Sequence, residues 1–374
     1  MVCYEVFLQV FTGSGDTSGY RAEEMIGRIR TIASDIRVDK VIIGWTREAS
    51  VYRKLASFLH EQGIQMLLWL PAFSEGIENS RPDQATDIFG KTVIGPDSAE
   101  DPSFHFVCPS SGRNARIVTD TYEKYFSDCG FDGVFLDRIR SQSFVTGVSG
   151  VLSCACRRCR KAFLDKGVNI DEVRNLYEEQ GDAFFDMASW PMNGEFVLEN
   201  QSAQRFFEVK EEIIAEAVAE LAGYFRRKGL IVGLDLFAPV ISRFVGQNYS
   251  LIAKAADFIK PMLYRRTEAP AGIGYEYALF EKCAPNARNN PRPTLNRAFL
   301  QTQIQAFKDL PCEKYPGIEV NYDQDLVKTD AEYVRESLAV IRECGLDGAA
   351  LCWDIMQAPE AHIAAAAVMR GENG

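Results

Sequence analysis

Histidine is scarce in this sequence, and long apolar runs are missing. The 374 residues include only three histidines, His60, His105 and His362, so a metal centre built mainly from imidazole is not expected. No apolar run approaches the roughly 18 residues needed to cross a bilayer. The first residues, Met1–Glu5, have neither the basic nor the apolar region of a signal peptide. We therefore expect a soluble, cytoplasmic protein.

Positive charge is also in short supply. The chain has 41 lysines and arginines against 52 acidic residues, which gives a net charge of -11. Binding to a phosphate backbone or to an anionic membrane needs a positive surface, so we expect neither a nucleic-acid nor a membrane partner. Association into a homo-oligomer is compatible with this composition. The segment Gly13–Asp16 is not the G-x-G-x-x-G loop that many doubly wound sheets use to bind phosphate.

Eight short apolar runs alternate with longer amphipathic stretches. Runs of this kind are typical of a parallel sheet that helices cover on both faces. Eight strands are the number that closes a (β/α)8 TIM barrel, so we predict one α/β barrel over residues 1–374, with an open doubly wound sheet as the alternative. We expect the segment 141–199 to form a cysteine-rich subdomain inserted after strand four. The predicted strands are Tyr4–Phe11, Lys40–Trp45, Ile64–Leu70, Gly133–Asp137, Ile231–Phe237, Phe258–Tyr264, Gly317–Asn321 and Gly348–Trp353.

Carboxylates stand at the ends of several predicted strands, where barrels place their active residues. Glycoside hydrolysis needs two of them: one acid protonates the leaving oxygen, and the other attacks the sugar or activates water. We predict Asp137, after strand four, as the acid/base and Glu319, on strand seven, as the nucleophile of a retaining enzyme. An inverting version pairs Asp137 with Asp235 or Asp354.

Aromatic and polar side chains at the other strand ends are the predicted substrate contacts. Aromatic rings stack on the apolar faces of sugars, and polar groups bind the hydroxyls. We therefore predict a glycoside hydrolase for a short oligosaccharide or glycoside. Two alternatives stay open: a carbohydrate-binding barrel without catalysis, and a lyase or isomerase whose Arg138 and Arg140 bind a sugar acid. The predicted contacts are Trp69, Arg140, Asp235, Tyr264, Trp353 and Asp354.

Three cysteines form a C-x-C-x-x-C motif at Cys154, Cys156 and Cys159. Reducing compartments keep thiols free, so clustered cysteines there indicate a metal more than disulfides. Three thiolates leave a tetrahedral zinc one ligand short. Cys108 is the preferred fourth ligand, and His105 competes with it. Four sulfurs predict a closed, structural zinc site.

The metal motif resembles that of family 42 β-galactosidases. The shared features are Cys108–Ser111, a nearby arginine (Arg113 or Arg116), and the C-x-C-x-x-C motif after strand four. The resemblance implies that the four cysteines hold a structural zinc beside an active-site barrel. It also implies a nucleophilic glutamate on strand seven, which Glu319 matches. The acid/base glutamate of that family follows an asparagine at the end of strand four, where this chain has Asp137.

The strand-four segment is similar to two further groups. It resembles uncharacterised glycoside-hydrolase-like barrels with an Asp-x-Ile-Arg motif, which here begins at Asp137. It is also similar to family 18 chitinases, whose motif runs Asp-Gly-x-Asp-x-Asp-x-Glu. Their catalytic glutamate falls at Ile139 and their middle aspartate at Phe135. A chitinase mechanism that relies on those acids is therefore disfavoured.

Overall fold

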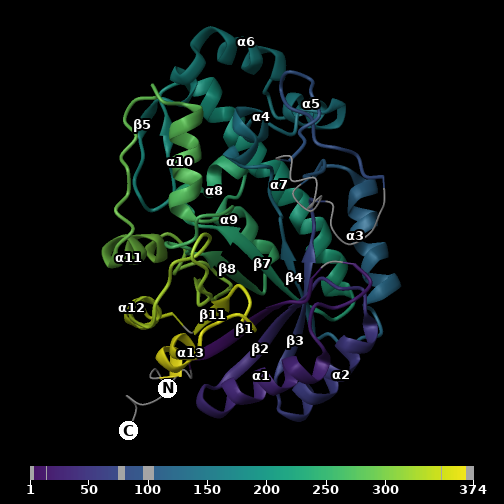
Figure 1. Cartoon of the computed structure of the whole chain (residues 1–374). Helices are drawn as coiled ribbons and strands as arrows, with labels where there is room; N and C mark the ends of the chain where they lie inside the picture. The colour runs from purple at the N-terminus through teal and green to yellow at the C-terminus, as the bar shows by residue number, and fades with distance from the viewer. Residues whose placement is uncertain (1–3, 14, 75–80, 96–104, 347, 368–374) are drawn as a thin grey trace.

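A computed structural model describes residues 4–13, 15–74, 81–95, 105–346 and 348–367. Its main sheet has nine parallel strands: eight form a barrel (Figure 1), and the two-residue β9 (Glu313–Lys314) pairs with the start of β8. The order is β10-β11-β1-β2-β3-β4-β7-β8, and pairing of Gly317 on β10 with Met262 on β8 closes it. The predicted TIM barrel is thus confirmed. The barrel strands are β1 (Glu5–Phe11), β2 (Val38–Gly44), β3 (Gln65–Pro71), β4 (Gly133–Asp137), β7 (Ile231–Phe237), β8 (Phe258–Met262), β10 (Gly317–Glu319) and β11 (Gly348–Cys352).

Aromatic side chains fill the barrel beneath its C-terminal end. The rings of Phe135 and Phe258 stack with their centroids 6.1 Å apart. Phe7 packs edge-on against Phe258 at 5.3 Å and stacks on Tyr315 at 4.0 Å. All four side chains are buried. This part of the interior is therefore a packed aromatic core.

Helices cover the outside of the barrel, as the amphipathic stretches predict. In α7, for example, Phe206, Ile214 and Phe225 lie on the buried face, because residues three and four apart share one side of a helix. Within the described residues, no helix is both long and apolar enough to span a bilayer. The covering helices are α1 (Ala22–Asp35), α2 (Ala49–Glu61), α3 (Gly112–Tyr125), α7 (Gln201–Arg227), α9 (Tyr249–Ile252), α10 (Ile273–Cys283), α11 (Arg297–Gln305), α12 (Ala331–Glu343) and α13 (Glu360–Ala367).

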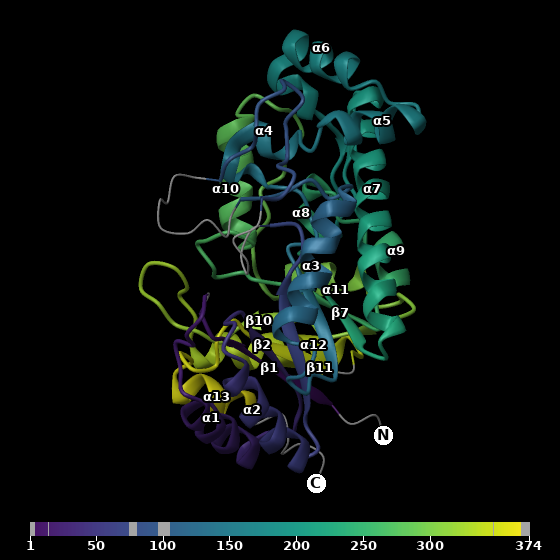
Figure 2. The ribbon, with the colours of Figure 1, turned by 90° about the vertical axis from the view of Figure 1, so that its right-hand side faces the viewer.

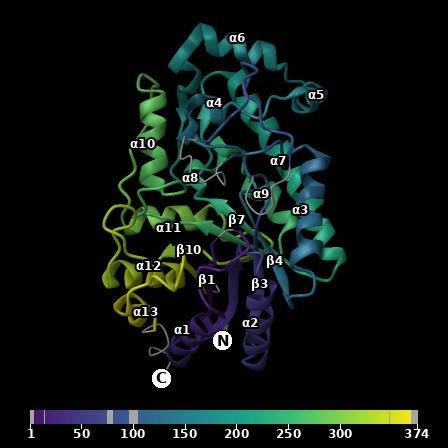
Figure 3. The ribbon, with the colours of Figure 1, turned by 45° about the vertical axis from the view of Figure 1, so that its right-hand side comes forward.

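The chain between β4 and α7 forms additional elements on top of the barrel. Figures 2 and 3 show α5 and α6 at the opposite end of the molecule from α1 and α2. The sequence predicted a helix over residues 161–168, whereas the structure places α5 about four residues earlier, and the prediction missed α6 and the short β5–β6 hairpin. These elements are α4 (Gly147–Val151), α5 (Arg157–Asp165), α6 (Ile170–Gln180), β5 (Met187–Ser189) and β6 (Val197–Leu198).

Candidate functional site

Asp137 ends β4 at the C-terminal mouth of the barrel, and two donors hold its carboxylate. The Trp69 indole N–H donates to Oδ2 over 2.9 Å. The backbone N–H of Arg138 donates to Oδ1 over 2.5 Å. Trp69 reaches Asp137 because β3 and β4 pair in register, with Pro71 opposite Asp137. The aromatic residue predicted to contact sugar therefore also orients the predicted catalytic acid.

Asp235 is a second carboxyl group at this end of the barrel. It lies on β7, the strand next to β4, where Leu136 pairs with Leu234 one residue before the two acids. Its Oδ2 is 3.1 Å from the Lys260 ammonium. Its Oδ1 is buried and has no hydrogen-bond partner within the part of the chain that the structure describes. The two acids are therefore neighbours on adjacent strands, and one of them has an unused oxygen.

The environment of Asp235 favours its protonated form. Burial is the main cause, and it raises the pKa of Asp235 to about 7. The positive charge of Lys260 opposes this rise in pKa, and the nearby negative charge of Asp137 adds to it. The Asp235 carboxyl group can therefore hold a proton at a much higher pH than an exposed aspartic acid, which is what a general acid requires.

Lys260 connects Asp235 to the rest of the site. Its side chain comes from β8, is fully buried, and donates to the Tyr264 hydroxyl over 3.0 Å and to Gln9 Oε1 over 3.1 Å. The sulfur of Cys352, the last residue of β11, lies 3.7 Å from the same ammonium. Tyr264, a predicted substrate contact, is thus a hydrogen-bond acceptor for the lysine that pairs with Asp235.

Two arginines that follow Asp137 bring positive charge to the site. Arg138 has a left-handed backbone with φ of 54°, and its guanidinium carbon lies 4.6 Å from the centre of the Trp45 ring. The guanidinium carbon of Arg140 lies 4.5 Å from the Phe106 ring and 4.2 Å from the Phe237 ring. Burial lowers the pKa of Arg140 to about 10, which still leaves it charged at neutral pH.

Glu319, the predicted nucleophile, is fully buried and strongly hydrogen bonded. Its Oε1 accepts from the Arg266 backbone N–H over 2.8 Å and from the Thr267 hydroxyl over 3.2 Å. Its Oε2 accepts from the Tyr333 hydroxyl of α12. Burial raises the pKa of Glu319. Among the described residues, its hydrogen bonds join β10 to the loop after β8 and to α12, and none of them leads to Asp137.

Trp353 and Asp354 follow β11 and are held by one asparagine. The Asn321 side-chain oxygen accepts from the Trp353 N–H over 2.7 Å and from the Asp354 N–H over 3.0 Å. Asp354 is buried, and its Oδ2 accepts from the Tyr20 hydroxyl over 2.9 Å. Trp353 keeps part of its surface in contact with solvent. Of these two predicted contacts, Trp353 is therefore the more accessible one.

Trp45 is a residue of this site that the predicted set omits. Its ring packs edge-on against Trp69 at 5.5 Å and against Phe11 at 5.3 Å. Its indole N–H is buried without a hydrogen-bond partner in the described chain. Gly44 makes this packing possible, since a Cβ there would lie 2.5 Å from the Trp69 carbonyl oxygen. The signal in the sequence that could have identified Trp45 is an aromatic residue at the end of a predicted strand, which is the signal that identified Trp69.

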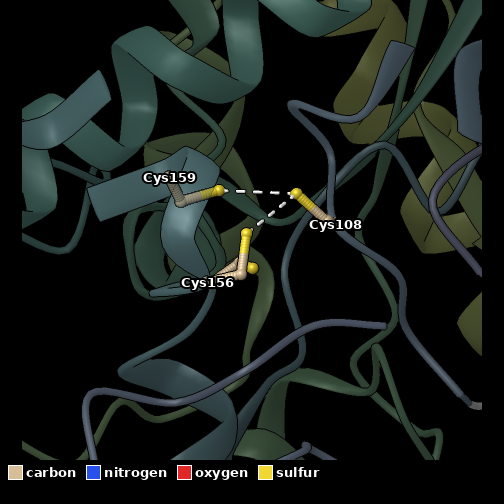
Figure 4. A group of neighbouring side chains, drawn as sticks. Cys108, Cys156 and Cys159 are labelled. Atoms are coloured by element: carbon tan, nitrogen blue, oxygen red, sulfur yellow. Dashed lines mark hydrogen bonds between the residues drawn. The ribbon is translucent and has the colours of Figure 1, made fainter. Parts of the chain in front are cut away.

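Four cysteines form a separate cluster beside the barrel. The sulfur atoms of Cys108, Cys154, Cys156 and Cys159 all lie within 4.8 Å of one another. The Cys108 sulfur is 3.5 Å from those of Cys156 and Cys159 (Figure 4). A tetrahedral zinc with bonds of about 2.3 Å separates its sulfur ligands by about 3.8 Å, so the cluster has almost the right size. Cys108 is in the group, and His105 is not.

The two segments of the cluster have their own supports. The Asn114 side chain, in the first turn of α3, donates to the Cys108 carbonyl oxygen over 2.9 Å. Cys156 is the N-cap residue of α5, which places Cys159 in the first turn of that helix. The Cys159 sulfur is 3.5 Å from the Ser110 hydroxyl. Four thiolates suit a soft metal ion and leave no position for substrate, so this arrangement is compatible with a structural metal site.

Comparisons with known proteins bear on the fold. No family model and no curated protein matches the sequence. The glycoside hydrolase domain of PgaB (BpsB) from Bordetella bronchiseptica is similar in structure, with a TM-score of 0.60 and 13% identity over 96% of this chain and 98% of that one. The C-terminal domain of a putative chitinase from Desulfitobacterium hafniense DCB-2 has a TM-score of 0.50 and 11% identity over 97% of both chains.

A third similar structure is longer than this chain. α-L-Fucosidase isoenzyme 2 from Paenibacillus thiaminolyticus has a TM-score of 0.58 and 11% identity over 99% of this chain. The match spans about half of the fucosidase, 49% of its length. At these identities the likeness shows the fold, a (β/α)8 barrel of the kind that glycoside hydrolases use. The resemblance to family 42 β-galactosidases stays a prediction.

Proposed function

We propose that the protein is a glycoside hydrolase in which Asp235 is the general acid and Asp137 the nucleophile. The observation that carries the proposal is the pairing of two unlike carboxyl groups on adjacent strands. Asp235 has a pKa raised to about 7, and its Oδ1 has no hydrogen-bond partner among the described residues. Asp137 accepts two hydrogen bonds that fix both of its oxygens. Neighbouring acids with different environments are a common way to divide acid and nucleophile roles.

In the proposed reaction, Asp235 donates its proton to the glycosidic oxygen as the bond to the anomeric carbon breaks. Asp137 attacks that carbon and forms a covalent glycosyl ester. Asp235, now ionised, then takes a proton from the water that hydrolyses the ester. Neighbouring strands lie about 4.7–4.9 Å apart, which is close to the carboxyl separation of about 5–5.5 Å in retaining enzymes.

The earlier assignment of Glu319 as nucleophile has less support. A nucleophile must reach the anomeric carbon. Glu319 has no exposed surface, and its two oxygens bind Arg266, Thr267 and Tyr333, whereas Asp137 keeps 9% of its surface exposed at the mouth of the barrel. We propose that Glu319 instead positions the loop after β8. Three variants separate these roles: Asp137→Asn, Asp235→Asn and Glu319→Gln.

The experiment measures sugar release from a panel of nitrophenyl glycosides and oligosaccharides. We expect Asp137→Asn and Asp235→Asn to lose at least about 100-fold in rate. Proton NMR of the first product should show a retained anomeric configuration. Full activity in both aspartate variants would overturn the assignment. Binding without turnover by the native protein would support the non-catalytic alternative, and an unsaturated or isomerised product would support the lyase or isomerase.

We also propose that the four cysteines hold Zn²⁺ in a structural role. The ion would link the segment before α3, which carries Cys108, to the insertion 141–199, which carries the other three ligands. All nine cysteines of the described residues are free thiols, which supports the proposed location in a reducing compartment such as the cytoplasm.

A further inference from the structure

A tight hairpin follows β10 at the rim of the barrel; residues 321–329 are called the rim hairpin below. Asp323 and Val327 exchange two backbone hydrogen bonds, of 2.8 and 3.1 Å. The Asp323 side chain accepts from the N–H groups of Asp325 and Leu326, over 2.8 and 2.9 Å. The turn from Asp323 to Val327 is therefore held by four hydrogen bonds within the hairpin itself.

Loops at two neighbouring strand ends hold the rim hairpin in place. Val327 forms a bridge with Thr267 in the loop after β8. The Glu268 N–H donates to the Leu326 carbonyl oxygen over 2.7 Å. Asn321, at the base of the hairpin, binds the Trp353 N–H after β11. The hairpin thus lies at the C-terminal end of the barrel, the end that carries Asp137 and Asp235.

Two large apolar side chains of the rim hairpin face solvent. Tyr322 is 55% exposed and Leu326 is 46% exposed. The hairpin that carries these two side chains is held by hydrogen bonds. The two side chains therefore stay exposed, whereas a loosely held loop could fold them inward. Two side chains are far too few for a stable protein interface, which buries about 800 Å² per partner. A single sugar ring, in contrast, matches the area of one tyrosine ring.

A continuous set of contacts links this surface to the proposed catalytic acid. Asp235 pairs with Lys260, whose ammonium is 3.7 Å from the Cys352 sulfur. Trp353 comes next in the chain and is tied to Asn321, and Tyr322 follows Asn321. The exposed tyrosine and the partly exposed tryptophan therefore lie on neighbouring loops that lead outward from the site.

From this arrangement we infer that the rim hairpin is a stacking platform for a sugar unit remote from the bond that is cleaved. Tyr322 supplies the ring, and the exposed polar side chains of Gln324 and Asp325 lie on the same hairpin to bind hydroxyls. The inference rests on the proposed function and specifies its substrate class. The substrate is an oligosaccharide chain that extends past the catalytic acids to the rim, and a simple glycoside uses only part of the site.

The test compares long and short substrates in Tyr322→Ala. Loss of one stacking contact of about 0.5–1.5 kcal/mol should raise KM for cello-, manno- or N-acetylchito-hexasaccharide about two- to tenfold, with kcat unchanged. Nitrophenyl monoglycosides should be hydrolysed at the native rate. Tyr322→Phe keeps the ring and should restore the native KM. Leu164→Ala alters a 63% exposed residue on α5 and is the control. It should change neither KM nor kcat for either substrate.

Two outcomes would overturn the inference. One is an unchanged KM for the hexasaccharide in Tyr322→Ala. The other is an equal loss of kcat/KM on the hexasaccharide and on the monoglycoside. A native protein that cleaves none of these substrates would contradict the proposed hydrolase instead. In that case calorimetric titration with the same hexasaccharides still tests the platform, because weaker binding by Tyr322→Ala than by Leu164→Ala is expected, and equal binding would contradict it.

Discussion

The Lys260 ammonium lies 3.1 Å from Asp235 Oδ2, and the other carboxyl oxygen, Oδ1, has no hydrogen-bond partner within the described ranges. The lysine holds Oδ2, so the unused Oδ1 is the atom that can carry and deliver a proton. Burial raises the pKa of Asp235 in spite of the nearby ammonium. The contact with Lys260 thus fixes the position of the acid, while burial favours its protonated form.

The stability of the protein should fall as the pH rises from about 4 to about 7. In the unfolded chain Asp235 loses its proton near pH 3.9, whereas in the folded protein its pKa is about 7. The folded state therefore binds the extra proton in this window, and stability decreases by up to about 4 kcal/mol across it. Asp235→Asn should reduce that slope, and Glu319, whose pKa is also raised by burial, should keep its own share of it. Urea unfolding at a series of pH values measures it, and an unchanged slope in the variant would contradict the raised pKa.

Removal of the lysine should move the alkaline limb of the activity profile. The positive charge of Lys260 lowers the pKa of Asp235, so Lys260→Met should raise that pKa above about 7. Activity would then persist to higher pH, since the general acid stays protonated. The measurement is kcat/KM against pH. Lys40→Met is the matched control. Lys40 pairs with Glu5, so its loss should not move the alkaline limb of the activity profile. An alkaline limb at the same pH in both variants and the native protein would argue against Asp235 as the acid.

Two tryptophans differ in the use of their indole N–H. That of Trp190 donates to the Val240 carbonyl oxygen over 3.2 Å, and that of Trp45 has no partner in the described chain. Both side chains are buried. Trp190→Phe should therefore lower the free energy of unfolding by about 1 kcal/mol more than Trp45→Phe does. Chemical denaturation compares them, and an equal or larger loss in Trp45→Phe would show that the Trp45 N–H is bonded after all, for instance to internal water.

Metal analysis of the purified protein should find about one zinc per chain. Cys156→Ser removes one ligand and should reduce both the zinc content and Tm, because the ion links two segments of the chain. Cys344 is the matched control, since it is also half-buried and lies outside the cluster. Cys344→Ser should keep its zinc. Native protein without zinc, or a Cys156→Ser variant of native stability, would contradict the metal proposal.

Much of this fold could be predicted from the pattern of apolar runs. The bounds of the strands at Gly133–Asp137 and Ile231–Phe237 are as predicted, because each is a buried run with a clear end: the first ends in Asp137, and Pro239 follows the second. Cys108 was predicted to join the cysteine motif because it precedes the helix that leads to strand four. In the structure its sulfur lies in one cluster with those of the motif. Chain topology alone was sufficient for that step.

Other features depend on contacts that no local pattern contains. That Trp69 donates to Asp137 follows from the register of β3 and β4, and the sequence gives no register. Glu319 resembled a catalytic acid at a strand end, but its partner Tyr333 lies on a helix further along the chain. The prediction also missed α6, although its signals were present in the sequence: Asn169 caps the helix, and apolar residues recur at helical spacing at Ile170, Val173, Leu176 and Tyr177. The β5–β6 hairpin has strands of only three and two residues, which are too short to show a pattern. Side-chain partners, more than strand positions, were therefore beyond the reach of the sequence.

The most direct test of the account is the leaving-group dependence of Asp235→Asn. A general acid matters most when the departing oxygen must be protonated, and a dinitrophenolate leaves without a proton. We predict that the variant loses at least about 100-fold in kcat/KM on an oligosaccharide and keeps most of the glycosylation rate on a dinitrophenyl glycoside of the same sugar. An equal loss on both substrates, or no loss on either, would contradict the assignment of Asp235 as the proton donor.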